Sequence, residues 1–181
     1  MQVLIAYHSD YGSTERMSQA VAAGVNAARP EASVVRKQVS ETTLDDLVAA
    51  DVIFFGTPVH MGSMAWQVKK LIDEAAKLWM ENALAGKVGA VFATGGGFGG
   101  AGGGVELTLA SLYSNFLEHG MVVVGFPKDQ TGYADGGLQW GPYARSANYE
   151  GMPTGITDAQ LTAARAYGAH VAETAERLLH D

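Results

Sequence analysis

The sequence predicts a doubly wound α/β fold, in which a five-stranded parallel sheet carries helices on both faces. Short apolar segments alternate with longer segments of helical periodicity along residues 1–181, and we expect a single domain. Strands that alternate with helices pair in parallel, because each helix returns the chain over a face of the sheet. One run, 51–56 (DVIFFG), is apolar without alternation, as expected of a central strand covered on both faces. The strand order 2-1-3-4-5 is one of the two common orders of such sheets.

The individual elements follow from local residue patterns. Apolar and β-branched runs that end in Gly, Pro or hydroxyl residues predict strands at 2–7, 32–39, 51–56, 87–93 and 121–126. Helical spacing of apolar residues predicts helices over 17–25, 44–50, 66–79, 105–119 and 157–179. Pro30 ends the first helix, and Thr157 or Asp158 can cap the last one.

The segment 127–155 has neither helical nor strand periodicity, yet it contains four large aromatic residues: Tyr133, Trp140, Tyr143 and Tyr149. A loop of this length in a compact domain is usually functional. We expect it either to cover the ligand-binding edge of the sheet or to bury itself in a neighbouring subunit. The second arrangement is favoured, because Trp140 and Tyr143 would otherwise expose apolar area.

Composition excludes several classes of function. The 12 Lys and Arg against 19 Asp and Glu leave a net charge of −7, which opposes nucleic-acid binding. Since the chain has no apolar run long enough to span a membrane and no secretory signal, a cytoplasmic protein is expected. The absence of cysteine removes disulfides, Fe–S clusters and thiol nucleophiles. No metal site is expected, because the five histidines lack ligand spacing: His8, His60, His119, His170 and His180.

The loop that follows the first expected strand has the composition of a phosphate site. It reads SDYGST over 9–14 and precedes a helix, whose free N–H groups and positive dipole end can hold a phosphate. The loop lacks the lysine of the GxxxxGK[ST] pattern and the glycines of a dinucleotide fingerprint. A monophosphate held by hydroxyls and amides fits it better. Alternatively, Ser13 or Thr14 serves only as a helix cap.

Two more loops are expected at the same edge of the sheet, because ligands of such sheets bind outside the carboxyl ends of the strands. Residues 57–64 (TPVHMGSM) are uncharged and partly apolar, which suits the edge of a flat aromatic ring, although a simple turn would look similar. Residues 94–104 (TGGGFGGAGGG) let backbone amides approach a planar ligand closely. The alternative for this glycine loop is a flexible surface linker.

Five segments together resemble the WrbA family of flavodoxin-like NAD(P)H:quinone oxidoreductases. They are SDYGST, FGTPVHMGSM, LWMENALAGK, the glycine loop after VFAT, and EHGMVVVG, in the order and approximate spacing of the family. The most specific pieces are G-T-P-x-x-x-G-x-M and L-W-x-x-x-A-L-x-G-K, and GPYA at 141–144 resembles the family's TPYG. The resemblance covers most of the chain.

The resemblance implies non-covalently bound FMN, with 9–14 around the phosphate, 59–61 beside the isoalloxazine ring and 94–98 at its polar edge. The cofactor contacts that it implies are Ser9, Asp10, Tyr11, Gly12, Ser13, Thr14, Pro58, Val59, His60, Met61, Gly62, Thr94, Gly95, Gly96, Gly97, Phe98, Gly99, Glu118 and His119. Tyr11 is also expected to touch the nicotinamide nucleotide, and Met61 the substrate. Trp79 resembles the aromatic wall of the substrate space, often contributed across a subunit contact. Its alternative role is core packing at a helix end.

This sequence departs from the family pattern at three places. Glu118 precedes His119 where the family has two histidines, so that either residue is a candidate for the ring contact. Gly97 stands where a threonine is expected. The link between Val39 and Asp51 is shorter than in typical members, which weakens the inference that this chain shares the family's tetrameric assembly.

The activity implied is transfer of a hydride from NAD(P)H to the flavin and then of two electrons to a quinone, with the cofactor carrying the electron chemistry. A homodimer or homotetramer is expected. One alternative is a flavodoxin-type electron carrier, which would need a strongly acidic face, whereas the three loops hold one carboxylate, Asp10. An FMN-dependent azo- or nitroreductase differs only in its oxidant, and a flavin-free protein could retain the fold.

Overall fold

A parallel sheet forms the centre of the molecule. In the computed structural model, which describes residues 1–179, its four long strands lie in the order β2-β1-β3-β5. They are β1 (Gln2–Tyr7), β2 (Ser33–Gln38), β3 (Val52–His60) and β5 (Val88–Gly95). This confirms the first four positions of the expected strand order.

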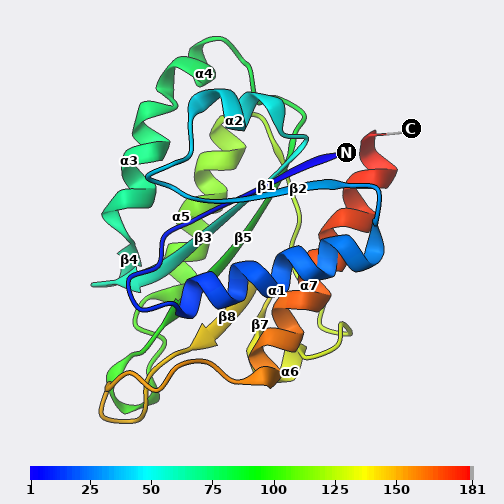
Figure 1. Ribbon diagram of the computed structural model, residues 1–181. Helices are drawn as coiled ribbons and strands as arrows, with labels where there is room; N and C mark the ends of the chain where they lie inside the picture. Colours follow the sequence, from blue (N-terminus) through cyan, green and yellow to red (C-terminus); the bar gives the residue numbers. More distant parts are fainter. Residues whose placement is uncertain (180–181) are drawn as a thin grey trace.

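Helices cover both faces of the sheet, as expected (Figure 1). One core lies between the sheet and the helices α1 (Ser13–Ala28) and α7 (Asp158–Leu179). A second core lies on the opposite face, under α2 (Leu44–Ala49), α3 (Trp66–Glu74), α4 (Ala76–Met80) and α5 (Val105–Glu118). Strand β5 is buried over its whole length, as expected of a central strand with helices on both faces.

Two helix ends test the local predictions. The helix expected over 66–79 is interrupted at Ala75, where the backbone adopts φ −76° and ψ 2° between α3 and α4. The cap of α7 is Thr157: its Oγ1 accepts the Gln160 N–H at 3.2 Å, and Gln160 Oε1 accepts the Thr157 N–H at 2.9 Å. This reciprocal pair is a capping box, and it confirms one of the two expected caps.

The fifth strand position is divided between two segments, which corrects the expectation of one strand over 121–126. Only β6 (Val122–Val123) forms there, and it pairs in parallel with Val88 and Gly89 at the start of β5. The other end of β5 pairs in parallel with β8 (Gly141–Arg145). The expectation that 127–155 lacks regular structure is therefore wrong, since α6 (Tyr133–Gly136) and β7 (Gly137–Leu138) also lie in it. Two further short elements were not predicted: β4 (Ser63–Met64), antiparallel to β3, and the 3-10 turn Phe98–Gly100.

Two buried tyrosines fill the gap between β6 and β8. The hydroxyls of Tyr113 and Tyr167 each donate to the Val124 carbonyl at 2.6 Å, and the Val91 N–H donates to Tyr167 Oη at 3.4 Å. Burial raises the pKa of both tyrosines well above the usual value, so both hydroxyls stay protonated. Side chains thus satisfy backbone groups that an unbroken edge strand would have paired.

Candidate functional site

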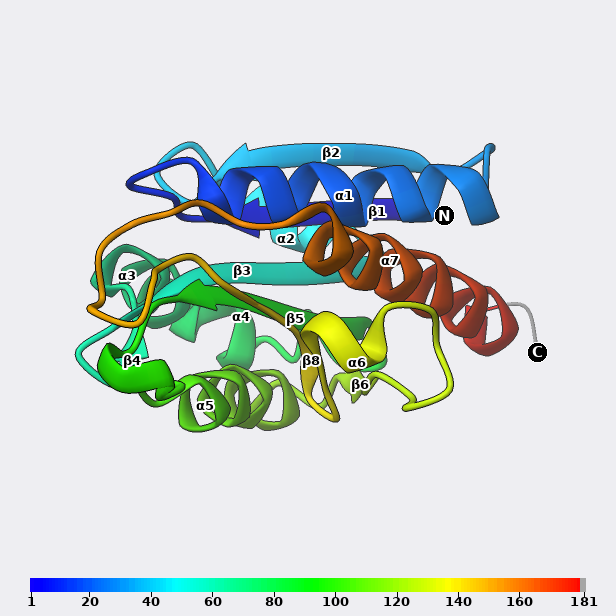
Figure 2. The same cartoon turned by 90° about the horizontal axis from the view of Figure 1, so that it is seen from below.

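A cleft lies at the carboxyl ends of β1, β3 and β5, where the sheet register brings Tyr7 beside Gly56 and Pro58 beside Thr94. Figure 2 shows the loops that follow these strands gathered at one end of the molecule, together with the segment that precedes α7. The cleft is lined by Ser9, Asp10, Tyr11, Ser13, Thr14, Pro58, Val59, His60, Thr94, Gly95, Gly96, Ser146, Ala147, Gly151 and Pro153. The three loops expected to meet at this edge do meet.

The start of α1 is open toward the cleft. Gly12 occupies the N-cap position with φ +83°, and no side chain caps the helix. The alternative that Ser13 or Thr14 serves only as a cap is therefore wrong. The N–H groups of the first turn, together with the positive end of the helix dipole, provide donors for an anion. The Thr14 hydroxyl is instead 2.7 Å from that of Thr94, and this buried pair joins the loop to β5.

Ser9 carries an unsatisfied hydroxyl at the same place. Its Oγ is buried and has no hydrogen-bond partner within the described part of the chain, although the residue lines the cleft. A buried polar atom without a partner costs about 1–3 kcal/mol, and such an atom calls for an explanation. A ligand oxygen in the cleft would supply the missing partner.

The second loop is a tight hairpin between β3 and β4. Met61 (φ +47°) and Gly62 (φ +84°) form its two-residue turn, and positive φ at both positions is the geometry of a type I′ turn. The Met61 side chain is fully exposed. Pro58, Val59 and His60 face the cleft, whereas Met61 and Gly62 line an adjoining hollow with part of the glycine loop.

The glycine loop is held in place and is not a free linker. Gly96 packs so tightly that a Cβ atom there would lie 2.1 Å from Ala147 Cβ. The Gly99 N–H donates to the Tyr149 carbonyl at 2.7 Å. Gly95 and Gly96 reach the cleft and Gly97 lines the adjoining hollow, while the Phe98 side chain is 75% exposed.

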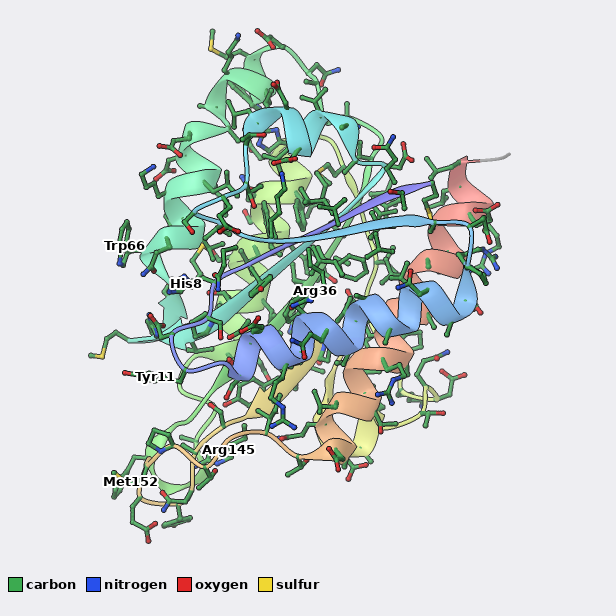
Figure 3. All side chains as sticks on the ribbon, in the orientation of Figure 1. His8, Tyr11, Arg36, Trp66, Arg145 and Met152 are labelled. Atoms are coloured by element: carbon green, nitrogen blue, oxygen red, sulfur yellow. The ribbon has the colours of Figure 1, made fainter. Side chains whose placement is uncertain are left out.

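Arg145 at the end of β8 binds this loop, a role that no sequence pattern indicates. Its guanidinium donates to the carbonyls of Gly97 (2.5 Å) and Ala101 (3.0 Å). It also donates to the carbonyls of Ala147 (3.0 Å) and Asn148 (2.9 Å) in the segment that follows β8. Figure 3 shows Arg145 at the base of these loops and Met152 farther out, near their tip. A single side chain therefore joins the two loops that border one side of the cleft.

Three of the four aromatic residues of 127–155 pack within their own chain, whereas Tyr149 is 69% exposed. Trp140 and Tyr143 lie partly buried against the core beneath α5, and the Tyr143 hydroxyl donates to the Gly95 carbonyl at 3.0 Å. The argument that these rings need a neighbouring subunit is therefore wrong. The alternative expectation holds for the end of the segment, because Ser146, Ala147, Gly151 and Pro153 line the cleft.

Three residues implied by the family resemblance lie at the opposite end of the sheet. Trp79, Glu118 and His119 line a separate hollow between α4 and the end of α5. The Gly86 N–H donates to the Gly120 carbonyl beside this hollow, just before β5 begins. Burial lowers the pKa of His119. Within one chain, these side chains do not meet the cleft.

The sequence predicts neither a metal site nor a membrane-spanning helix. Within residues 1–179, no group of three or more His, Cys, Asp or Glu side chains is placed to hold a metal ion, and His180 lies outside this range. None of the helices described is both long and apolar enough to cross a bilayer.

Comparison with known proteins identifies the family. Residues 16–128 match the family model described as NADPH-dependent FMN reductase. The chain belongs to this family. It is 36% identical to a protein of Syntrophobacter fumaroxidans named NAD(P)H dehydrogenase (quinone), over 98% of each chain. These matches agree with the resemblance found in the sequence.

Solved structures support the same assignment. A WrbA-like flavodoxin from Agrobacterium tumefaciens is 31% identical with a TM-score of 0.74, over 97% of this chain and 98% of that one. A flavodoxin from the Archaea, 23% identical, shares the fold with a TM-score of 0.69 over 97% and 99% of the two chains. The resemblance to WrbA proteins and the flavodoxin-like fold are confirmed.

We predict that Arg145→Lys loosens the glycine loop. Lysine keeps the charge but loses the planar fork, so that at least one bond worth about 1.5–3 kcal/mol is lost. Hydrogen exchange followed by mass spectrometry should show the amides of Gly99 and Met152 exchanging about tenfold faster or more. Arg177→Lys, which alters an exposed contact on α7, is the control. Equal protection in both variants would contradict this role of Arg145.

Proposed function

We propose that this protein is an FMN-dependent NAD(P)H:quinone oxidoreductase that holds its cofactor in the cleft at the carboxyl ends of β1, β3 and β5. The observation that carries the proposal is the conjunction of an uncapped helix start with the unpaired Ser9 hydroxyl in one cleft. The relative named NAD(P)H dehydrogenase (quinone), which matches over nearly the whole chain, supports the donor and the acceptor.

The residues of the cleft fit FMN in three parts. Hydroxyls and N–H groups of 9–14 would hold the phosphate, and the cleft lining contains neither Lys nor Arg to do so. Val59 and His60 on one side, and the backbone of Gly95 and Gly96 on the other, would flank the ring. Bound FMN would supply the electron chemistry, taking a hydride from NAD(P)H and giving two electrons to a quinone.

Exposed apolar side chains border the mouth of the cleft and would contact flat substrates. Tyr11 is 86% exposed and projects from the edge of the molecule in Figure 3, and Met61, which lines the adjoining hollow, is fully exposed. Tyr11 would contact the nicotinamide and Met61 the quinone. The electron-carrier alternative is disfavoured, because Asp10 is the only carboxylate among the residues of the cleft and it is paired with histidines.

Reduction and reoxidation of bound flavin test the proposal directly. After reconstitution with FMN, anaerobic NADH or NADPH should bleach the flavin absorbance, and benzoquinone should restore it. Bound flavin that neither nicotinamide can bleach would favour an electron carrier. Protein that fails to bind FMN would refute the cofactor assignment.

We predict that Ser9→Ala weakens FMN binding without destabilising the protein that lacks FMN. The unpaired hydroxyl makes no bond that favours folding, and its burial without a partner is a cost, whereas a bond to bound phosphate is worth about 1 kcal/mol, or roughly fivefold in Kd. Quenching of flavin fluorescence gives Kd, and thermal unfolding of the apoprotein gives stability. Ser40→Ala, in an exposed turn, is the control. A marked loss of apoprotein stability with an unchanged Kd would contradict the assignment.

The proposal also includes a homodimer or homotetramer in the cytoplasm, where NAD(P)H is available. Trp79, Glu118 and His119 lie far from the cleft of their own chain, so only a second copy could bring them to the flavin. Light scattering at micromolar concentration should give a mass of two or four chains. Trp79→Ala should then weaken quinone binding. A monomer that is fully active would contradict this part of the proposal.

A further inference from the structure

A carboxylate lies between two histidines at the cleft. Asp10 Oδ1 is 3.1 Å from His8 Nε2, and Asp10 Oδ2 is 3.2 Å from His60 Nε2. His8 and Asp10 follow β1, whereas His60 ends β3, so that the contact joins two loops. Figure 3 places His8 and Tyr11 at the same edge of the molecule.

The geometry fixes the state of the two imidazole rings. An ionised carboxylate only accepts hydrogen bonds, so each Nε2 must carry a hydrogen to bond with it. In neutral His60, Nδ1 is then the nitrogen that gains and loses a proton.

The two histidines differ in exposure, and this difference separates their roles. The His8 side chain is 15% exposed and does not line the cleft, so it fixes the orientation of the Asp10 carboxylate. The His60 side chain is 42% exposed and lines the cleft, so it can meet both a bound substrate and water. His60 is therefore the member of the group that can exchange protons with a ligand.

The reaction under Proposed function, on which this inference rests, requires an acid. A quinone becomes a hydroquinone by gaining two electrons and two hydrogens. NAD(P)H supplies one hydrogen with the electron pair, and the other must arrive as a proton. The titratable side chains that line the cleft are Asp10, Tyr11 and His60. Tyrosine is a weak acid, with an ordinary pKa of about 10, and ionised Asp10 has no proton to give.

We propose that His60 donates this proton to the quinone and that Asp10, oriented by His8, is the positioning residue that holds the donor. As one quinone oxygen takes the hydride equivalent, the ring becomes aromatic and the C=O π bond of the second carbonyl opens to an oxyanion. The Nδ1–H bond of His60 then breaks while the O–H bond of the hydroquinone forms. Water returns a proton to His60. The sum is NAD(P)H, a proton and a quinone giving NAD(P)⁺ and a hydroquinone.

Two oxidants separate proton donation from other roles of the cleft. Benzoquinone needs protons, whereas ferricyanide accepts single electrons and needs none. Anaerobic stopped-flow should measure reoxidation of reduced, FMN-loaded protein by each oxidant. In His60→Gln, the ratio of the quinone rate to the ferricyanide rate should fall about 10²-fold, the lower range for general acid catalysis. Asp10→Asn should lower the same ratio about tenfold.

Controls show whether the effect is specific. His170→Gln, which removes a histidine on α7, should keep the wild-type ratio. A solvent isotope effect on the quinone step should be present in the wild type and lost in His60→Gln. An unchanged ratio in His60→Gln, or equal slowing with both oxidants, would overturn the donor role. If NAD(P)H fails to reduce the wild-type flavin, the proposed function itself is wrong and the donor role with it.

A measurement on the apoprotein tests the geometry without flavin. Nitrogen-15 NMR of the imidazole rings should place the hydrogen of neutral His60 on Nε2. The two rings face different oxygens of Asp10. In Asp10→Asn, an NH2 group replaces one of these oxygens and cannot accept from the ring that faced it, so at least one histidine should lose this preference. A hydrogen on Nδ1 of neutral His60 in the wild type would contradict the proposal.

Discussion

The end of β5 is paired on both sides, and the position of every loop around the cleft depends on this pairing. Thr94 lies beside Pro58 of β3, and Gly95 lies beside Arg145 of β8. Because the strand cannot fray here, the Thr94 hydroxyl is held against Thr14 of the first loop. Strand β8 thus does more than extend the sheet, since it also places the Arg145 guanidinium under the carbonyls of the glycine loop.

The cleft combines neutral donors with a single small charged group. Its phosphate end offers hydroxyls and the start of α1, and no cationic side chain lines it. The charged group consists of Asp10 and its two histidines, and it joins the first loop to the end of β3. Backbone dipoles can hold a dianion without a cationic side chain, which leaves His60 available for proton chemistry at the ring. Binding and proton transfer are therefore assigned to different parts of one cleft.

The sequence predicted what depends on local patterns and missed what depends on distant contacts. The first four strands and the three loops were predictable, because apolar runs and turn residues mark them directly. The sequence of β8, GPYAR, begins with Gly and Pro and has no strand pattern, since it is a strand only because β5 offers a free edge. The sequence also could not predict that the glycine loop is held in one conformation, because the contacts that hold it come from Arg145, which is distant in the chain. The family resemblance pointed to Trp79, Glu118 and His119, but chain order alone could not place them at the opposite end of the sheet.

A crystal structure of the protein with FMN tests the central claim most directly. The account predicts the phosphate within hydrogen-bond distance of Ser9 Oγ and of the first N–H groups of α1, with the ring between His60 and Gly96. A flavin bound elsewhere, or bound in the cleft with its phosphate away from 9–14 and the Ser9 hydroxyl still unpaired, would contradict it.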